Sequence, residues 1–156
     1  MLSKDRLSLS IVFAMPVLGM LSGWVCKMPD TESLAGRPPG WVFGVVWPVL
    51  YTLMGLVGRS VFLKQNPLEM WLWGTVMAST LAWPAVVSCD SKRGRWVAGM
   101  LLIAVNLIVG TMLLVSMVQH GHGAVVLAIV PFLAWNSFAA LLNWQLIREG
   151  ARRGSP

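Results

Sequence analysis

The sequence predicts an all-α integral membrane protein, a bundle of five transmembrane helices that forms a single membrane domain over residues 1–156. Of the 156 residues, 56% are hydrophobic and only 12% are charged, and the mean hydropathy is +0.70. The charges fall between long apolar runs. Soluble domains carry about 25% charged residues and disordered chains have low hydrophobicity, so both of those classes are excluded.

Five apolar runs are long enough to cross a bilayer, whose hydrocarbon core of about 30 Å requires about 20 helical residues. We expect helices over residues 7–26, 41–62, 70–88, 96–119 and 124–147. The first run follows Lys4 and Arg6, as the apolar part of a signal peptide would. Its full length, and the lack of an Ala-x-Ala-like cleavage site after it, favour a retained first helix.

The stretch from Trp96 to Ile147 contains no Asp, Glu, Lys or Arg and is too long for one span. The Gly-rich segment at residues 119–123 divides it, and we expect a hinge there with His120 and His122 at a polar hairpin tip. A His-x-His metal site is the alternative, but no third ligand or carboxylate lies nearby in the sequence. Cys26 and Cys89 have neither the number nor the spacing of a disulfide framework or a zinc site, so no metal site is predicted.

Four prolines fall inside the predicted spans, at Pro16, Pro48, Pro84 and Pro131. A membrane bundle tolerates such kinks because neighbouring groups satisfy the freed backbone atoms. Kinks also widen the gaps between helices, which makes room for a ligand.

The basic residues predict the orientation in the membrane. Eight of the twelve lie on the side of the first loop, the third loop and the C-terminus, and four lie on the other side. The positive-inside rule therefore places the first loop and the C-terminus in the cytoplasm. The net charge of +6 is explained by membrane anchoring, so no nucleic-acid partner is expected. No presequence or lipidation signal is visible, which favours a bacterial envelope membrane, with an organellar membrane as the alternative.

Ionisable and nucleophilic groups are scarce inside the spans. Only Arg59 and Glu69, both near span ends, bring a charge into them, which argues against an ion-coupled pump. There is no Gly-x-Ser-x-Gly motif and no carboxylate pair, so no hydrolase residue is predicted. The first loop, residues 27–40, is rich in Pro, Gly and acidic residues; it is a candidate lid over a binding site, or else a connector.

The nine tryptophans are the most informative residues. Six lie within about a turn of the predicted span ends, as interfacial belts do: Trp24, Trp41, Trp71, Trp73, Trp96 and Trp144. Trp47, Trp83 and Trp135 lie deeper. Trp47 shares a helix face with Tyr51, and Trp135 shares one with Phe138. Facing inward, these rings would line an apolar pocket for a flat hydrophobic ligand. Alternatively, they only pack the core.

Two long segments and one short one resemble a known family. Residues 38–55 read PPGWVFGVVWPVLYTLMG, residues 131–143 read PFLAWNSFAALLN, and residues 82–84 read AWP. They are similar to the second, fifth and third helices of the translocator protein family, also called tryptophan-rich sensory proteins or peripheral-type benzodiazepine receptors. The number of spans agrees, so the resemblance covers nearly the whole chain.

The resemblance implies a five-helix bundle, commonly dimeric, that binds tetrapyrroles, sterols and synthetic ligands in a cavity beneath the first loop. The matching ligand-binding positions are Trp47, Tyr51, Trp83, Trp135, Phe138 and Ala139. It implies a porphyrin, protoporphyrin or haem-like, as the ligand and no required cofactor. In an alternative implied by the same family, the chain is a membrane enzyme for light- and oxygen-dependent porphyrin degradation, with Trp47 and Trp135 as its catalytic residues.

The chain departs from the family pattern at several positions. The aromatic residues of the family's first loop are absent here. Thr80 replaces an Asn, and Val86 and Val87 replace aromatic residues, so we expect a wider or less polar cavity. Trp144 replaces the Tyr of the family's sterol motif, before Arg148, which leaves a sterol as a secondary ligand class.

Small residues on one face of the third span predict a homodimer. Gly74, Ala78 and Ala82 are spaced by four, which permits close backbone approach between helices in lipid, or else close packing within the bundle. Three function classes follow from the sequence: a receptor, sensor or carrier for tetrapyrroles in contact with membrane lipid, the porphyrin-degrading enzyme, and a structural partner subunit that binds no small molecule.

Overall fold

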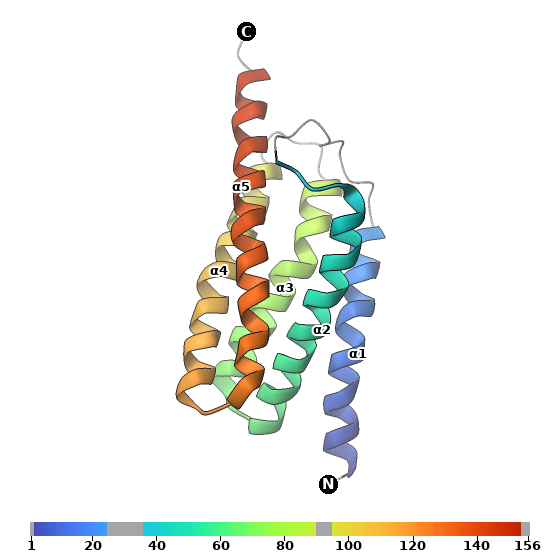
Figure 1. Cartoon of the computed structure of the whole chain (residues 1–156), viewed down its shortest axis with the longest axis vertical. Helices are drawn as coiled ribbons and strands as arrows, with labels where there is room; N and C mark the ends of the chain where they lie inside the picture. The colour runs from blue at the N-terminus through green and yellow to red at the C-terminus, as the bar shows by residue number, and fades with distance from the viewer. Residues whose placement is uncertain (1, 25–35, 90–94, 154–156) are drawn as a thin grey trace.

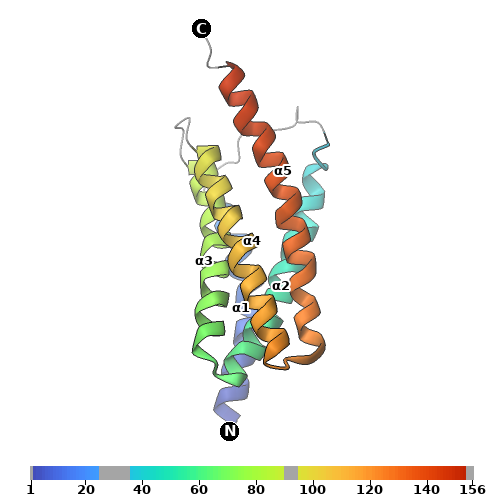
Figure 2. The same cartoon turned by 90° about the vertical axis from the view of Figure 1, so that its left-hand side faces the viewer.

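The computed structural model describes residues 2–24, 36–89 and 95–153, which form five long helices and one short 3₁₀ segment (Figure 1). The elements are α1 (Leu2–Trp24), α2 (Gly40–Lys64), α3 (Pro67–Cys89), α4 (Arg95–Gln119), η1 (Gly123–Ala128) and α5 (Ile129–Arg153). The helices run along the long axis of the molecule, and the two chain ends lie at its opposite ends, as an odd number of antiparallel helices requires. α3 and α4 lie side by side in the perpendicular view (Figure 2), and α1 lies against α2.

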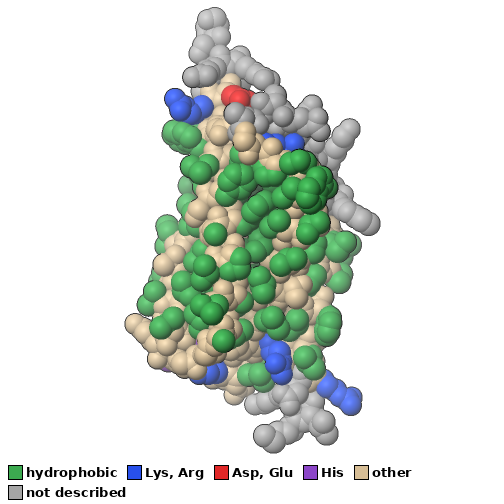
Figure 3. Space-filling model, in the orientation of Figure 1, with side chains coloured by type: hydrophobic (Ala, Val, Ile, Leu, Met, Phe, Trp, Pro, Cys, Tyr) green, Lys and Arg blue, Asp and Glu red, His purple; other side chains and the backbone are tan. Residues whose placement is uncertain are grey.

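The class predicted from the sequence is confirmed. Four segments are long and apolar enough to cross a membrane: Gly40–Lys64, Pro67–Ser88, Arg95–Gln119 and Gly123–Glu149. In the described part of α1 the apolar stretch, Ser8–Ser22, is shorter. Hydrophobic side chains cover the middle of the bundle, and Lys and Arg side chains gather at its two ends (Figure 3). The chain is an integral, multi-pass membrane protein.

The turn between α2 and α3 is tighter than predicted. Gln65 ends α2 in the left-handed conformation, with φ of 55°, and its N–H donates to the Val61 carbonyl. The Asn66 side chain accepts the Leu68 N–H at 3.1 Å, so Asn66 caps α3 and Pro67 occupies the first helical position, which Pro favours. These caps extend both helices beyond the predicted bounds.

The fifth predicted span is not regular over its whole length. Its first residues form η1, and the α-helix begins only at Ile129. Pro131 lies in the first turn of α5, where a backbone N–H has no partner within the helix, so its missing N–H costs no hydrogen bond. An α-helix that began at residue 124 would place Pro131 in its interior and would lose a backbone hydrogen bond there. The predicted lid is largely outside the described residues, because only residues 36–40 of it are described.

The core forms where α1 to α5 approach one another closely. Met54, Leu113, Met117 and Phe132 are at most 1% exposed. At Gly55 an added Cβ would lie 2.8 Å from the Val12 Cα, so the absence of a side chain allows the backbones of α1 and α2 to touch.

The interfacial-belt interpretation holds for some of the six tryptophans only. Trp41, Trp71 and Trp144 are more than half exposed on the outside of the bundle. Trp73 is turned inward, where its Nε1–H donates to the Met54 carbonyl at 2.9 Å and its ring lies over Gly58. Trp73 therefore packs inside the bundle, and Trp96, although it lies at the start of α4, lines the cavity described below. The Trp24 side chain is outside the described residues.

Candidate ligand-binding cavity

A cavity of about 470 Å³ lies inside the bundle, and all five long helices contribute to its wall. It extends from Arg37 and Gly40, at the start of α2, to Asn106 in the middle of α4. The start of α2 lies at the same end of the bundle as the end of α5 (Figure 1). Asn106 follows the start of α4 by eleven residues, which corresponds to a depth of roughly 16 Å. The volume is within the usual range for small-molecule sites, roughly 300–1,000 Å³.

Five of the six predicted ligand-binding residues line this one cavity: Trp47, Tyr51, Trp83, Trp135 and Ala139. Phe138 does not line it. Its ring lies behind Trp135, with the two centroids 5.4 Å apart, so it supports the Trp135 ring. The structure thus brings the rings of α2, α3 and α5 together, while their part in binding stays a prediction.

On the α2 side the rings are held by tight packing. The centroids of Trp47 and Tyr51 are 5.6 Å apart and their planes are tilted by 33°. A Cβ at Gly19 of α1 would lie 2.1 Å from the Tyr51 ring, so the ring fits only because residue 19 has no side chain. Tyr51 is 4% exposed and therefore has little freedom to leave the wall.

On the α5 side the Trp135 ring packs against two phenyl rings. The Phe43 ring of α2 meets it edge-on with the centroids 5.6 Å apart, and the Phe138 ring lies at a centroid distance of 5.4 Å with the planes tilted by 46°. Such aromatic pairs are worth about 0.5–1.5 kcal/mol each beyond the apolar area they bury. Phe43 was not among the predicted residues, although its position four residues before Trp47 places both on one face of α2.

Polar groups line the deep end of the cavity. Ser79 of α3 donates to the Asn106 Oδ1, and the Asn106 Nδ2 donates to the Asn136 Oδ1 at 3.2 Å. The Asn136 amide in turn donates to the Phe132 carbonyl at 2.9 Å. This chain joins α3, α4 and α5 at mid-bundle. The side chains of Asn106 and Asn136, together with Thr80, therefore make the deep end of the cavity polar.

Three buried polar atoms of the cavity wall have no hydrogen-bond partner among the described residues: Trp83 Nε1, Trp135 Nε1 and Asn143 Oδ1. The Asn143 amide nitrogen is committed to the Trp96 carbonyl at 2.7 Å. A buried polar atom without a partner costs about 1–3 kcal/mol. The cavity wall therefore contains two donors and one acceptor that are buried without a partner.

A second hollow, about 430 Å³, lies on the outer surface between α2 and α5. Its walls include Val45 and Val49, which are more than half exposed. Trp135 belongs to both hollows, so its ring separates the internal cavity from this lipid-facing groove. The groove is almost entirely apolar and open, whereas the internal cavity combines ring faces with polar groups; the cavity is the better candidate site.

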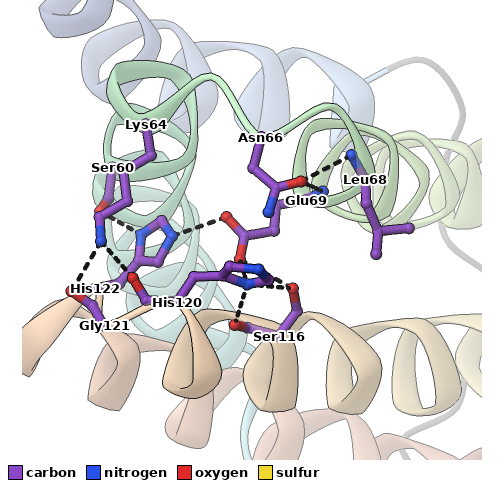
Figure 4. A network of polar contacts seen from close by, with 9 residues as sticks. All are labelled: Ser60, Lys64, Asn66, Leu68, Glu69, Ser116, His120, Gly121 and His122. Atoms are coloured by element: carbon purple, nitrogen blue, oxygen red, sulfur yellow. Dashed lines mark hydrogen bonds and ion pairs between the residues drawn. The ribbon is translucent and has the colours of Figure 1, made fainter.

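A polar cluster at the opposite end of the bundle was not foreseen (Figure 4). Glu69 in the first turn of α3 is fully buried. Its Oε2 contacts the His122 Nε2 at 2.8 Å, and its Oε1 lies 2.9 Å from the Ser116 Oγ and 3.2 Å from the His120 Nδ1. Glu69 is near a helix end as expected, but it is not peripheral.

Hydrogen bonds connect Glu69 to two neighbouring elements. The Ser116 hydroxyl donates to one oxygen of the Glu69 carboxylate, and the His122 Nε2 is hydrogen-bonded to the other. On the opposite side of its ring, the His122 Nδ1 is hydrogen-bonded to the Ser60 Oγ at 2.8 Å. Lys64 completes the cluster by donating to the His120 and Gly121 carbonyls at 2.5 Å and 2.9 Å. The cluster fastens the α4–α5 turn to α2 and α3.

His120 and His122 lie in the turn between α4 and η1, as predicted, but their side chains differ in exposure. The His122 side chain is completely buried, whereas the His120 side chain is 52% exposed. The described residues contain no group of His, Cys, Asp and Glu side chains that could hold a metal ion. Although two imidazoles meet a carboxylate here, the His120 Nδ1 lies 2.8 Å from the Ser116 carbonyl, an acceptor, so this nitrogen carries a proton and is not free to ligate.

The fold and the cavity together define a class: a small α-helical membrane protein whose bundle encloses a tryptophan-lined chamber. The model of the TspO/MBR family matches residues 10–148. The chain is 27% identical to the translocator protein of Ovis aries over 125 residues, which are 76% of this chain and 72% of that protein. It is 29% identical to the Homo sapiens translocator protein over 119 residues, 72% and 68% of the two chains.

A further relative is the tryptophan-rich protein TspO of Chlorobaculum tepidum. The two chains are 28% identical over 117 residues, which are 72% of each. The chain belongs to the TspO/MBR family, as the motifs in α2 and α5 predicted.

Replacement of Glu69 by Ala is expected to lower the free energy of unfolding by about 3 kcal/mol, because the buried Ser116 and His122 side chains lose their common partner. Titration with a denaturing detergent, followed by circular dichroism, measures this change. His120→Ala, at a half-exposed ring, is the control and should cost less than about 1 kcal/mol. Equal losses in the two variants would contradict the assignment of Glu69 as the centre of the cluster.

Proposed function

We propose that the chain is a membrane receptor, sensor or carrier that binds a porphyrin-like tetrapyrrole or another flat hydrophobic molecule in the internal cavity. The observation that carries the proposal is the convergence of six aromatic side chains from four helices on one chamber: Phe43, Trp47, Tyr51, Trp83, Trp96 and Trp135. Ring faces in an apolar, enclosed site favour a planar guest, since stacking and apolar burial both contribute to its affinity.

The names of the relatives agree with this class. Two of them are called translocator proteins and one is called a tryptophan-rich protein TspO. We extend the proposal to a cytoplasmic location of the first loop and the C-terminus, in a bacterial envelope membrane or, alternatively, an organellar one. The support for this orientation is the excess of basic residues at that end of the chain.

We also propose a homodimer that forms through α3. Ala78 is exposed on the outside of the bundle, and no atom lies within 4 Å of the position that a Cβ on Gly74 would take. Gly74 and Ala78 are therefore free of the close intrabundle contacts that the alternative requires. A small-residue face turned to lipid lets a second copy approach closely.

Trp47→Ala and Trp135→Ala are each expected to weaken protoporphyrin binding at least tenfold, which is about 1.4 kcal/mol, because each change removes a ring face from the cavity. The absorbance of the porphyrin, titrated with purified protein in detergent, measures the affinity. Trp71→Ala is the matched control, since Trp71 is 77% exposed outside the cavity, and it should bind as the unsubstituted protein does.

Affinities of the Trp47 and Trp135 variants within twofold of the control would contradict the proposal. Illumination of the bound porphyrin in air, followed by mass spectrometry, separates binding from degradation. An unchanged porphyrin is the result expected for a receptor or carrier, and conversion that depends on Trp47 and Trp135 would favour the enzyme.

The dimer is tested by cysteine cross-linking in lipid bilayers. In a chain with Cys26→Ser and Cys89→Ser, Ala78→Cys should form an intermolecular disulfide on mild oxidation, because symmetry brings the two copies of residue 78 together. Leu101→Cys, 63% exposed on α4, is the control and should remain a monomer. Equal cross-linking at both positions, or none at residue 78, would argue against an α3 interface.

A further inference from the structure

Arg37 is the single charged residue in the described wall of the cavity. It lies three residues before α2 begins, at the end of the cavity near the end of the bundle. Its guanidinium carbon is 5.5 Å from the centroid of the Phe43 ring, and Phe43 in turn contacts Trp135. The cation is therefore joined directly to the aromatic wall at which the apolar part of a ligand would lie.

The charge of Arg37 is not neutralised by the described part of the chain. The ion pairs found there join Glu69 to His120 and to His122, at the other end of the bundle. Arg37 is only partly exposed, so water screens its charge less than at an open surface. A cation of this kind attracts an anionic group that enters the cavity.

The start of α2 adds to the positive potential at the same place. Gly40 is the first residue of α2 and also lines the cavity. No side chain caps this helix end, because the preceding residue is Pro39. The positive end of the helix dipole therefore lies beside Arg37, and it reinforces the charge of the guanidinium.

We propose that the cavity selects planar ligands that carry a carboxylate at one edge, and that Arg37 is the residue that determines this specificity. The apolar body of the ligand then lies among Trp47, Tyr51 and Trp135, while its carboxylate pairs with the guanidinium at the outer end. Arg matches a carboxylate with two parallel hydrogen bonds, which fixes the orientation of the ligand as well as its charge. The inference rests on the proposed function, and it disfavours neutral guests such as sterols.

The test compares two ligands that differ only in charge, protoporphyrin and its dimethyl ester, on the purified full-length chain in uncharged detergent. Arg37→Gln should weaken the binding of the free acid about tenfold and leave the affinity for the ester unchanged. Arg37→Lys keeps the positive charge but loses the planar guanidinium. The affinity of this variant for the free acid should therefore lie between that of the unsubstituted protein and that of Arg37→Gln. Arg148→Gln removes a charge from an exposed position of α5 outside the cavity wall, and it should leave both affinities within twofold.

Equal effects of Arg37→Gln on the acid and on the ester, or no effect on either, would overturn the inference while leaving the proposed function intact. A lipid phosphate is the competing anion for Arg37. If added phosphatidylglycerol removes the preference of the unsubstituted protein for the acid, Arg37 pairs with lipid and the inference is wrong. Failure of both porphyrins to bind the unsubstituted protein would refute the proposed function itself.

Discussion

The hydrocarbon core of a bilayer contains no water that could hydrogen-bond to a polar group, and the hydrogen bonding of this molecule's backbone and buried side chains follows from that constraint. The backbone satisfies it by forming helices, and the buried side chains satisfy it by binding one another. Ser79, Asn106 and Asn136 form one such chain at mid-bundle. The Glu69 cluster forms another at the α2–α3 end. The helices between these points are held by apolar packing and by glycines that allow close contact.

The two ends of the bundle consequently differ in packing. At one end, the Glu69 cluster joins α2, α3 and α4 through hydrogen bonds of Ser60, Glu69, Ser116 and His122. At the other end the helices separate around aromatic rings, and the cavity extends inward from Arg37. Trp83, Trp135 and Asn143 carry unpaired polar atoms there, whereas all the polar side chains of the Glu69 cluster are paired. Because the hydrogen bonds of the Glu69 cluster lie at the end opposite the cavity, a ligand can enter the cavity without breaking them.

Much of this architecture could be predicted from the sequence, because a span of about 20 apolar residues and a ring spacing of three or four are local signals. The number of spans, the prolines within them, and the pairing of Trp47 with Tyr51 and of Trp135 with Phe138 all rest on such signals, whereas the grouping of the two pairs around one cavity came from the family resemblance. Contacts between distant residues gave no such signal: Glu69 and His122 are 53 positions apart. Asn106 offered a signal that was missed, since an amide in the middle of an apolar run must find a partner inside the bundle. The inward turn of Trp73 depends on Gly58, a residue of another helix.

The account depends most directly on where a tetrapyrrole comes to rest. A crystal or electron cryomicroscopy structure of the chain with bound protoporphyrin would locate it. We expect the macrocycle inside the bundle, with its faces in van der Waals contact, within about 4 Å, of the Trp47 and Trp135 rings. A macrocycle in the outer groove between α2 and α5, or on the lipid-facing side of α3, with no ligand in the internal cavity, would contradict it.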